Sequence, residues 1–164
     1  HPEILQARVF MTSPAALRAS IVDVEFGDNV RVVEPCNLYG CTLGDGVFVG
    51  PFVEIQSDVV IGARTKVQSH TFICSLVSLG DDCFIGHGVM FVNDTFSSGR
   101  PAGGDKALWK RTLVGRNVSI GSNATILPVK ICDDVVIGAG SVVTKDILLP
   151  GVYMGNPARV QPQE

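Results

Sequence analysis

The chain has 164 residues, the length of a single domain, of which 46% are hydrophobic and only 18% are charged. This balance excludes a disordered segment, and the net charge of −3 argues against a protein that binds nucleic acid through a basic face. No apolar run approaches the roughly 18 residues of a membrane-spanning helix, and no signal peptide is visible, so we expect no insertion into a membrane.

The chain divides into three parts of very different length. Residues 1–20 precede the repeat described below, and we expect them to be an N-terminal extension or a segment added to the natural chain, with Met11 a plausible natural start. We expect one domain over residues 21–160 and a short tail over residues 161–164.

A six-residue repeat runs through most of this domain. An aliphatic or aromatic residue returns every six positions, at Leu43, Val49, Ile55, Ile61, Val67, Ile73, Leu79, Ile85 and Phe91. The repeat stops, resumes at Val114, and has a weaker beginning at Phe26. Glycine directly follows several of these residues, which we interpret as relief of backbone strain in a turn.

A period of six fits neither an α-helix nor a simple alternating strand. It fits a short strand with two inward-facing residues, followed by a turn. Three such units close a triangular coil of about 18 residues, and strands of successive coils stack about 4.8 Å apart. We therefore predict an all-β, parallel β-helix rather than an ordinary β-sandwich, with one long inserted loop over about residues 92–112.

Five cysteines are present, and none forms a CxxC pair. Their odd number does not suit a disulfide framework. We expect small, buried, apolar side chains in a reducing compartment.

Two segments carry a resemblance to a known family. GAGSVVTKD (residues 138–146) with GNPAR (155–159), and VQSHTFICSLVSLGDDCFIGHGVMFVNDTF (67–96), resemble the hexapeptide-repeat acyltransferases. The second segment is most similar to the dTDP-3-amino-3,6-dideoxyhexose N-acetyltransferases. The resemblance implies a left-handed β-helix, a homotrimer, acetyl-CoA as co-substrate and no metal.

The repeat also assigns residues to corners of the triangular coil, independently of the family. His70 and His87 fall on one corner in adjacent coils, whereas Asn93 and Asp94 fall on the following corner. Later coils bring Ser122, Asn123, Ala139 and Gly140 to the histidine corner. One subunit therefore keeps the histidines and the Asn-Asp pair on different edges, and we expect the active site to be assembled between subunits.

The inserted loop interrupts the repeat between Phe91 and Val114, a step of 23 residues that has gained 17 over the usual six. It contains the only tryptophan, Trp109. One interpretation is a spacer or a clasp between subunits. The other is a flap in which Trp109 offers an apolar face and Arg100, Lys106, Lys110 or Arg111 offers charge to a diphosphate.

Acetyl transfer to an amine requires a neutral amine, a proton acceptor and donors that stabilise the oxyanion. The candidate catalytic residues are His70, His87, Asn93 and Asp94. Either histidine is a candidate base, Asp94 competes with them, and the Asn-Asp pair alternatively orients the amine while water takes the proton. Backbone N–H groups near Gly121 or Gly138 are candidate oxyanion donors. The candidate substrate-binding residues are Gln68, Asn93, Asp94, Arg100 and Trp109.

Coenzyme A needs a surface for its pantetheine arm and cations for its phosphates. Small corner residues suit the arm, and cations near the C-terminus suit the phosphates. The candidate cofactor-binding residues are Ser122, Asn123, Ala139, Gly140, Ser141, Lys145 and Arg159.

Taken with the resemblance, the sequence predicts an acetyl-CoA-dependent N-acetyltransferase of the bacterial cytoplasm. It would act on a nucleotide-linked 3-amino-dideoxy sugar, dTDP in preference to UDP, for a surface polysaccharide or glycan. The alternatives are a sugar or serine O-acetyltransferase and a non-catalytic β-helix scaffold. A zinc hydro-lyase of the gamma carbonic anhydrase type needs three histidines, whereas the body of this chain has two.

Overall fold

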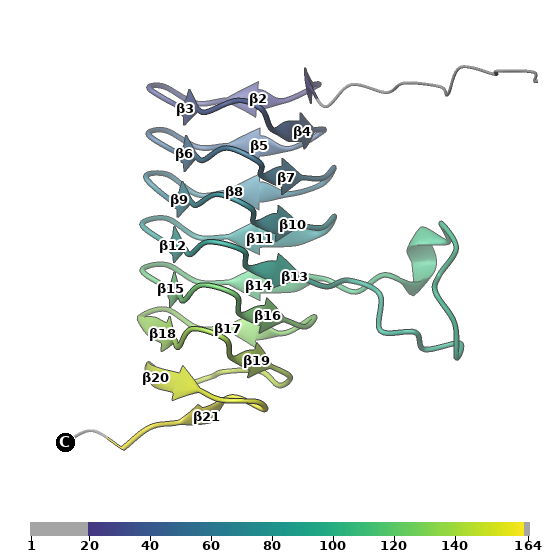
Figure 1. Cartoon of the computed structure of the whole chain (residues 1–164), viewed down its shortest axis with the longest axis vertical. Helices are drawn as coiled ribbons and strands as arrows, with labels where there is room; N and C mark the ends of the chain where they lie inside the picture. Colours follow the sequence, from purple (N-terminus) through teal and green to yellow (C-terminus); the bar gives the residue numbers. More distant parts are fainter. Residues whose placement is uncertain (1–19, 163–164) are drawn as a thin grey trace, which may run out of the picture.

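The computed structural model describes residues 20–162, and Figure 1 shows them as coils stacked in a single column. The strands form three parallel sheets, which confirms the predicted all-β, left-handed parallel β-helix. The expected N-terminal extension, including Met11, lies outside the described residues except for residue 20, as do residues 163–164 of the expected tail.

Each coil contributes one short strand to each sheet. Sheet A contains β1 (Ile21–Val22), β4 (Asn37–Tyr39), β7 (Glu54–Ile55), β10 (Phe72–Ile73), β13 (Met90–Phe91), β16 (Thr125–Ile126) and β19 (Val142–Val143). Sheet B contains β2 (Glu25–Phe26), β5 (Thr42–Leu43), β8 (Val60–Ile61), β11 (Val77–Leu79), β14 (Thr112–Val114) and β17 (Lys130–Ile131). Sheet C contains β3 (Arg31–Val32), β6 (Phe48–Val49), β9 (Lys66–Val67), β12 (Phe84–Ile85), β15 (Ser119–Ile120), β18 (Val135–Ile137), β20 (Gly151–Met154) and β21 (Arg159–Val160). Among the strands within residues 20–162, only β21 pairs antiparallel, with β20, at the C-terminal end of the column.

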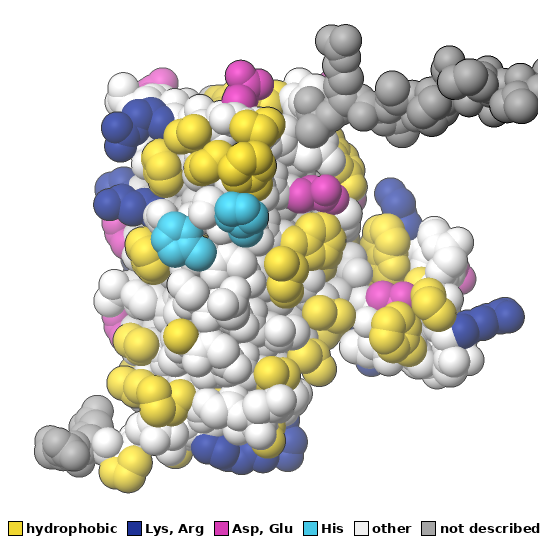
Figure 2. Space-filling model, viewed as in Figure 1, with side chains coloured by type: hydrophobic (Ala, Val, Ile, Leu, Met, Phe, Trp, Pro, Cys, Tyr) yellow, Lys and Arg dark blue, Asp and Glu magenta, His cyan; other side chains and the backbone are white. Residues whose placement is uncertain are grey.

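The inserted loop leaves the column between β13 and β14, where the interrupted repeat places it. It projects away from the coils in Figures 1 and 2 and carries a short 3-10 helix, η1 (Lys106–Leu108). No helix in the described part of the chain is long and apolar enough to cross a membrane.

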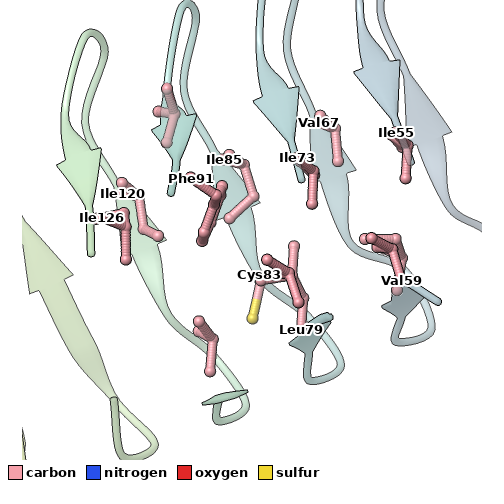
Figure 3. Close-up of a cluster of buried hydrophobic side chains, with 14 of the residues drawn as sticks. Ile55, Val59, Val67, Ile73, Leu79, Cys83, Ile85, Phe91, Ile120 and Ile126 are labelled. Atoms are coloured by element: carbon pink, nitrogen blue, oxygen red, sulfur yellow. The ribbon is translucent and has the colours of Figure 1, made fainter. Parts of the chain in front are cut away.

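The core is the interior of the column, where the repeating aliphatic residues stack in register (Figure 3). In sheet A, Ile55 lies opposite Ile73, and Phe91 lies opposite Ile126. These four side chains are at most 1% exposed. Four of the five cysteines are buried in the same core, Cys132 is half-buried, and all five are free.

The glycines that follow the aliphatic residues are required for a different reason from the predicted relief of backbone strain. Gly44, Gly50, Gly62, Gly80 and Gly86 have no left-handed backbone, so relief of strain at these positions is the wrong explanation. A Cβ atom at Gly80 would instead lie 2.5 Å from the carbonyl oxygen of Gly115 in the next coil. The left-handed residues come two positions later, at Gly46, Phe52, Arg64, Asp82 and Gly88, with φ between 56° and 66°. Glycine is therefore needed because the next coil passes too closely for a side chain.

Candidate active site

The structure places both histidines on the corner that joins sheet C to sheet A, which we call the histidine corner. It comprises residues 51–52, 69–70, 87–88, 122–123 and 139–140 of successive coils. A ladder of backbone hydrogen bonds keeps these coils in register: Gly88 N–H donates to the Ser69 carbonyl at 3.0 Å, and Asn123 N–H to the His87 carbonyl at 2.8 Å. Neighbouring coils therefore hold their corner side chains one above another.

His87 is exposed at its corner, and its ring has one hydrogen-bond partner among the described residues. Nδ1 lies 2.9 Å from the hydroxyl oxygen of Ser69, in the preceding coil. This contact holds the ring through Nδ1, and Nε2 has no partner among the described residues. A histidine held through one nitrogen, with the other free, is suited to proton transfer.

His70 has a different environment one coil earlier. Its backbone is left-handed, with φ 63°, and its ring lies against Phe52, with centroids 5.0 Å apart and planes tilted by 35°. Phe52 is itself 57% exposed. Figure 2 shows the two histidines side by side on an open face, next to a patch of hydrophobic side chains. The two rings are thus neighbours with different supports.

The next two coils present small residues and backbone donors at the same corner. The N–H groups of Gly121 and Gly138 donate to the carbonyls of Ile137 and Tyr153, both at 2.8 Å, so neither is available to an oxyanion. The N–H groups of Ser122 and Ala139, one residue on, have no partner among residues 20–162. The N–H groups of Ser69 and His87 in the earlier coils likewise have no partner among the described residues, so free donors follow one another along this corner.

The corner between sheets B and C shows why those donors are free. There the corresponding N–H groups are capped by aspartates of the next coil: Ala63 N–H donates to Asp81 at 2.8 Å, and Arg116 N–H to Asp133 at 2.7 Å. On the histidine corner no aspartate occupies this position. The sequence therefore caps the backbone N–H groups of the corner between sheets B and C and leaves those of the histidine corner free to bind a ligand.

Asn93 and Asp94 lie on the following corner, at the base of the inserted loop. The Asn93 side-chain amide donates to the Ser75 carbonyl at 3.1 Å. One carboxylate oxygen of Asp94 accepts from Phe96 N–H at 2.9 Å, and the other accepts from Ala102 N–H at 2.7 Å. Asp94 thus anchors the loop, and the pair stays apart from the histidines within one subunit, as the column assignment predicts.

The remaining candidates for substrate binding are spread over both corners. Gln68 follows β9 and is half-buried, with its N–H donating to the Ile85 carbonyl at 2.9 Å. Trp109 is half-buried in the loop, with the Lys106 ammonium 6.0 Å from its ring centroid, and Arg100 is exposed in the same loop. The structure places Trp109 and Lys106 on the loop, whereas Lys110 lies at its base, where its N–H donates to the Asn93 carbonyl at 2.8 Å.

A cavity of about 320 Å³ at the C-terminal end brings two predicted cations together. Lys145 and Arg159 both line it, with Thr144, Asp146 and Tyr153. Ser141 is fully buried, and its hydroxyl accepts from Gly155 N–H at 3.1 Å, which holds the terminal turn in place. Within residues 20–162, no group of three His, Cys, Asp or Glu is placed to hold a metal.

Ser69 and Phe52, which contact the two histidines, are not among the residues predicted from the sequence. The signal was available, because each precedes its histidine by 18 residues, one full coil. Tyr153 was also missed, since it lies on β20, beyond the last regular repeat.

Comparison with known proteins gives two matches to the repeat itself. The bacterial transferase hexapeptide matches residues 40–75, and the hexapeptide repeat of succinyl-transferase matches residues 111–145. Bifunctional protein GlmU of Acidithiobacillus ferrooxidans is 29% identical over 156 residues, which are 88% of this chain and 33% of that protein. The chain thus spans about a third of the length of the curated relatives it matches.

Solved structures share the same fold. Galactoside acetyltransferase in complex with coenzyme A is 32% identical, with a TM-score of 0.64, over 74% of this chain and 64% of its own. A mutant of perosamine N-acetyltransferase from Caulobacter crescentus, in complex with CoA and GDP-perosamine, is 23% identical. Its TM-score is 0.61, over 88% of this chain and 58% of its own.

Proposed function

Because this chain is a hexapeptide-repeat protein with the left-handed β-helix fold, we propose that it is an acetyl-CoA-dependent N-acetyltransferase. The proposed acceptor is the 3-amino group of a nucleotide-linked 3-amino-dideoxy sugar, with dTDP preferred to UDP. The product serves a bacterial surface polysaccharide or glycan, and the reaction takes place in the cytoplasm.

The order of groups along the axis of the column carries this proposal, with the coenzyme pocket on the corner that follows sheet A, where Asn93 also lies, and the histidines on the corner before it. The pocket of Lys145 and Arg159 at the C-terminal end suits the phosphates of coenzyme A. The free N–H groups of Ala139 and Ser122 come next, and His87 lies two coils before Ala139, about 10 Å along the axis at the usual strand spacing. A pantetheine arm that starts at the pocket crosses from the corner after sheet A to the histidine corner and brings its thioester to the histidines.

The chemistry follows from this order. The neutral amine attacks the thioester carbon, a C–N bond forms, and negative charge collects on the carbonyl oxygen, where Ser122 or Ala139 N–H stabilises it. A ring nitrogen of His87 or His70 accepts the amine proton. When the C–S bond breaks, the coenzyme thiolate takes that proton and leaves as the free thiol.

The acceptor approaches from the N-terminal side of the histidines, since the coenzyme occupies the C-terminal side. Phe52 and His70 present exposed aromatic rings there. In a homotrimer, the loop of a neighbouring subunit adds Asn93, whose side-chain carbonyl oxygen has no partner among the described residues, and the cations of the loop. We propose that these groups hold the sugar amine and the diphosphate.

A second candidate is O-acetyl transfer to a sugar hydroxyl. The observation that favours it is the 32% identity to galactoside acetyltransferase in complex with coenzyme A. A hydroxyl is a poorer nucleophile than an amine, so this reaction depends more strongly on a base, and loss of the histidine should abolish it.

Release of thiol from acetyl-CoA distinguishes the candidates. We expect turnover with a dTDP-linked 3-amino sugar, weaker turnover with the UDP-linked sugar and none with a galactoside. Turnover with the galactoside alone would support O-acetyl transfer. No turnover with any acceptor, together with no binding of coenzyme A, would contradict both and leave a scaffold.

A further inference from the structure

We propose that Ser69 is a positioning residue that makes His87, rather than His70, the proton acceptor of the site. The inference rests on the proposed function, because it names the base of that reaction. It arises from one contact, the 2.9 Å distance between the Ser69 hydroxyl oxygen and His87 Nδ1.

This contact is fixed by the backbone of both coils. Ser69 and His87 are 18 residues apart, and the Ser69 carbonyl accepts from Gly88 N–H at 3.0 Å. Ser69 is half-buried, so its hydroxyl is held in place while the His87 ring stays exposed. The serine therefore acts on the ring through a preformed geometry.

A hydroxyl can pair with Nδ1 either as acceptor or as donor, and the proposed arrangement is the first. His87 Nδ1–H donates to the Ser69 oxygen, and Nε2 then carries the lone pair that accepts the amine proton. The opposite tautomer would place a hydrogen on Nε2 and make it a donor. His70 has no equivalent hydroxyl partner among the described residues, since Phe52 lies one coil before it at the corresponding position.

Nitrogen NMR of the full chain reads the tautomer without any turnover. The chain has three histidines, and a His87→Gln variant assigns the His87 ring by the loss of its signals. At a pH where the ring is neutral, we expect a protonated Nδ1 and an unprotonated Nε2, and a shift toward Nε2–H in Ser69→Ala. A protonated Nε2 in the unaltered protein, or no change in Ser69→Ala, would overturn the inference.

Kinetics provides the second measurement. We expect Ser69→Ala to lower kcat about 10-fold with the KM for acetyl-CoA unchanged, and Ser69→Thr to restore kcat because it keeps the hydroxyl. Ser57→Ala is the matched control, since Ser57 also bonds across 18 residues, to Ser75 at 3.3 Å, on a different corner. An equal loss of kcat in Ser57→Ala would mean that Ser69 acts only on stability.

Failure of the inference is separate from failure of the proposed function. If the protein acetylates no acceptor, the N-acetyltransferase proposal fails, whereas the NMR result still decides whether Ser69 sets the tautomer. If turnover is observed and Ser69→Ala retains full kcat, the proposed role of Ser69 is wrong and the N-acetyltransferase proposal stands.

Discussion

Burial of the cysteine thiols makes the free energy of unfolding fall at alkaline pH. Burial in the column raises the pKa of the Cys74 thiol to about 12 and that of Cys41 to about 11, from an ordinary value of 9.0. Unfolded thiols ionise near the ordinary value, while the folded thiols remain neutral. Stability is therefore complete below about pH 9 and is lost as the pH rises toward the folded values.

We expect the free energy of unfolding, measured by urea titration, to be the same at pH 7 and pH 8 and to fall progressively above pH 9. Cys74→Ala should show a smaller fall between pH 9 and pH 10.5, whatever its stability at pH 7. An unchanged slope in that variant would mean that other groups cause the loss.

The turns of the coil depend on two different requirements for glycine. Gly80 has no left-handed backbone, but a Cβ atom there would meet the Gly115 carbonyl oxygen in the next coil. Gly140 has a φ of +68°, and a Cβ atom there would have nothing within 4 Å. Contact between coils decides the first position, and local strain decides the second.

We therefore expect Gly80→Ala to cost about 3 kcal/mol and Gly140→Ala about 1 kcal/mol in the free energy of unfolding. Gly80→Ala must separate two coils whose backbones are bonded at 2.9 Å, through Gly80 N–H and the Val114 carbonyl. Urea unfolding of the two variants measures the difference. Equal losses would indicate that coil spacing adapts freely.

The inserted loop is held at its base by a single carboxylate. Asp94 accepts two backbone N–H groups, from Phe96 and Ala102, and Lys110 N–H closes the base by donating to the Asn93 carbonyl at 2.8 Å. Loss of two hydrogen bonds of about 1 kcal/mol each shifts the opening of the loop more than 10-fold.

We expect chymotrypsin to cleave Asp94→Ala after Phe96, which is 59% exposed, at least 10-fold faster than the unaltered protein, with the melting temperature of the column nearly unchanged. Asp105→Ala is the control, because it removes only the cap of η1, the 3.0 Å bond from Ala107 N–H. If both variants are cleaved at the same rate, the anchor lies elsewhere.

The sequence predicts the positions of strands, corners and the insertion, because these depend only on the six-residue repeat. Its period places His70 and His87 on one corner and the insertion between Phe91 and Val114. The use of the Asp94 carboxylate depends on how the loop folds back, and the need for Gly80 depends on the approach of the next coil. Neither follows from a period along one chain.

At the scale of the whole molecule, the outer faces of the column carry exposed apolar side chains among polar ones. On sheet C, Phe84, Val136 and Val152 are 40–44% exposed. Such a surface is suited to self-association. Within one subunit the histidines lie apart from Asn93 and the loop, and association of subunits would bring them together. In a cyclic trimer, each site would take its histidine from one subunit and its loop from the next.

This arrangement predicts complementation between two inactive variants. His87→Ala lacks the base, and deletion of residues 94–110 removes 17 residues and restores the six-residue step of the column. After joint refolding at equal amounts, a site is complete when a loop-deleted subunit supplies the histidine and its His87→Ala neighbour supplies the loop. Random assembly makes about one site in four complete, so we expect about a quarter of the activity of the unaltered protein.

The control is the mass of each variant in solution, which should be three times that of the monomer, 17.4 kDa for the unaltered chain, so that lost activity is not lost assembly. The two variants mixed without refolding should stay inactive, because their subunits do not exchange. Trimers that regain no activity after joint refolding would place the histidine and the loop of each site in the same subunit. In that case the loop must fold across sheet A to reach its own histidine corner, against the anchoring of its base by Asp94.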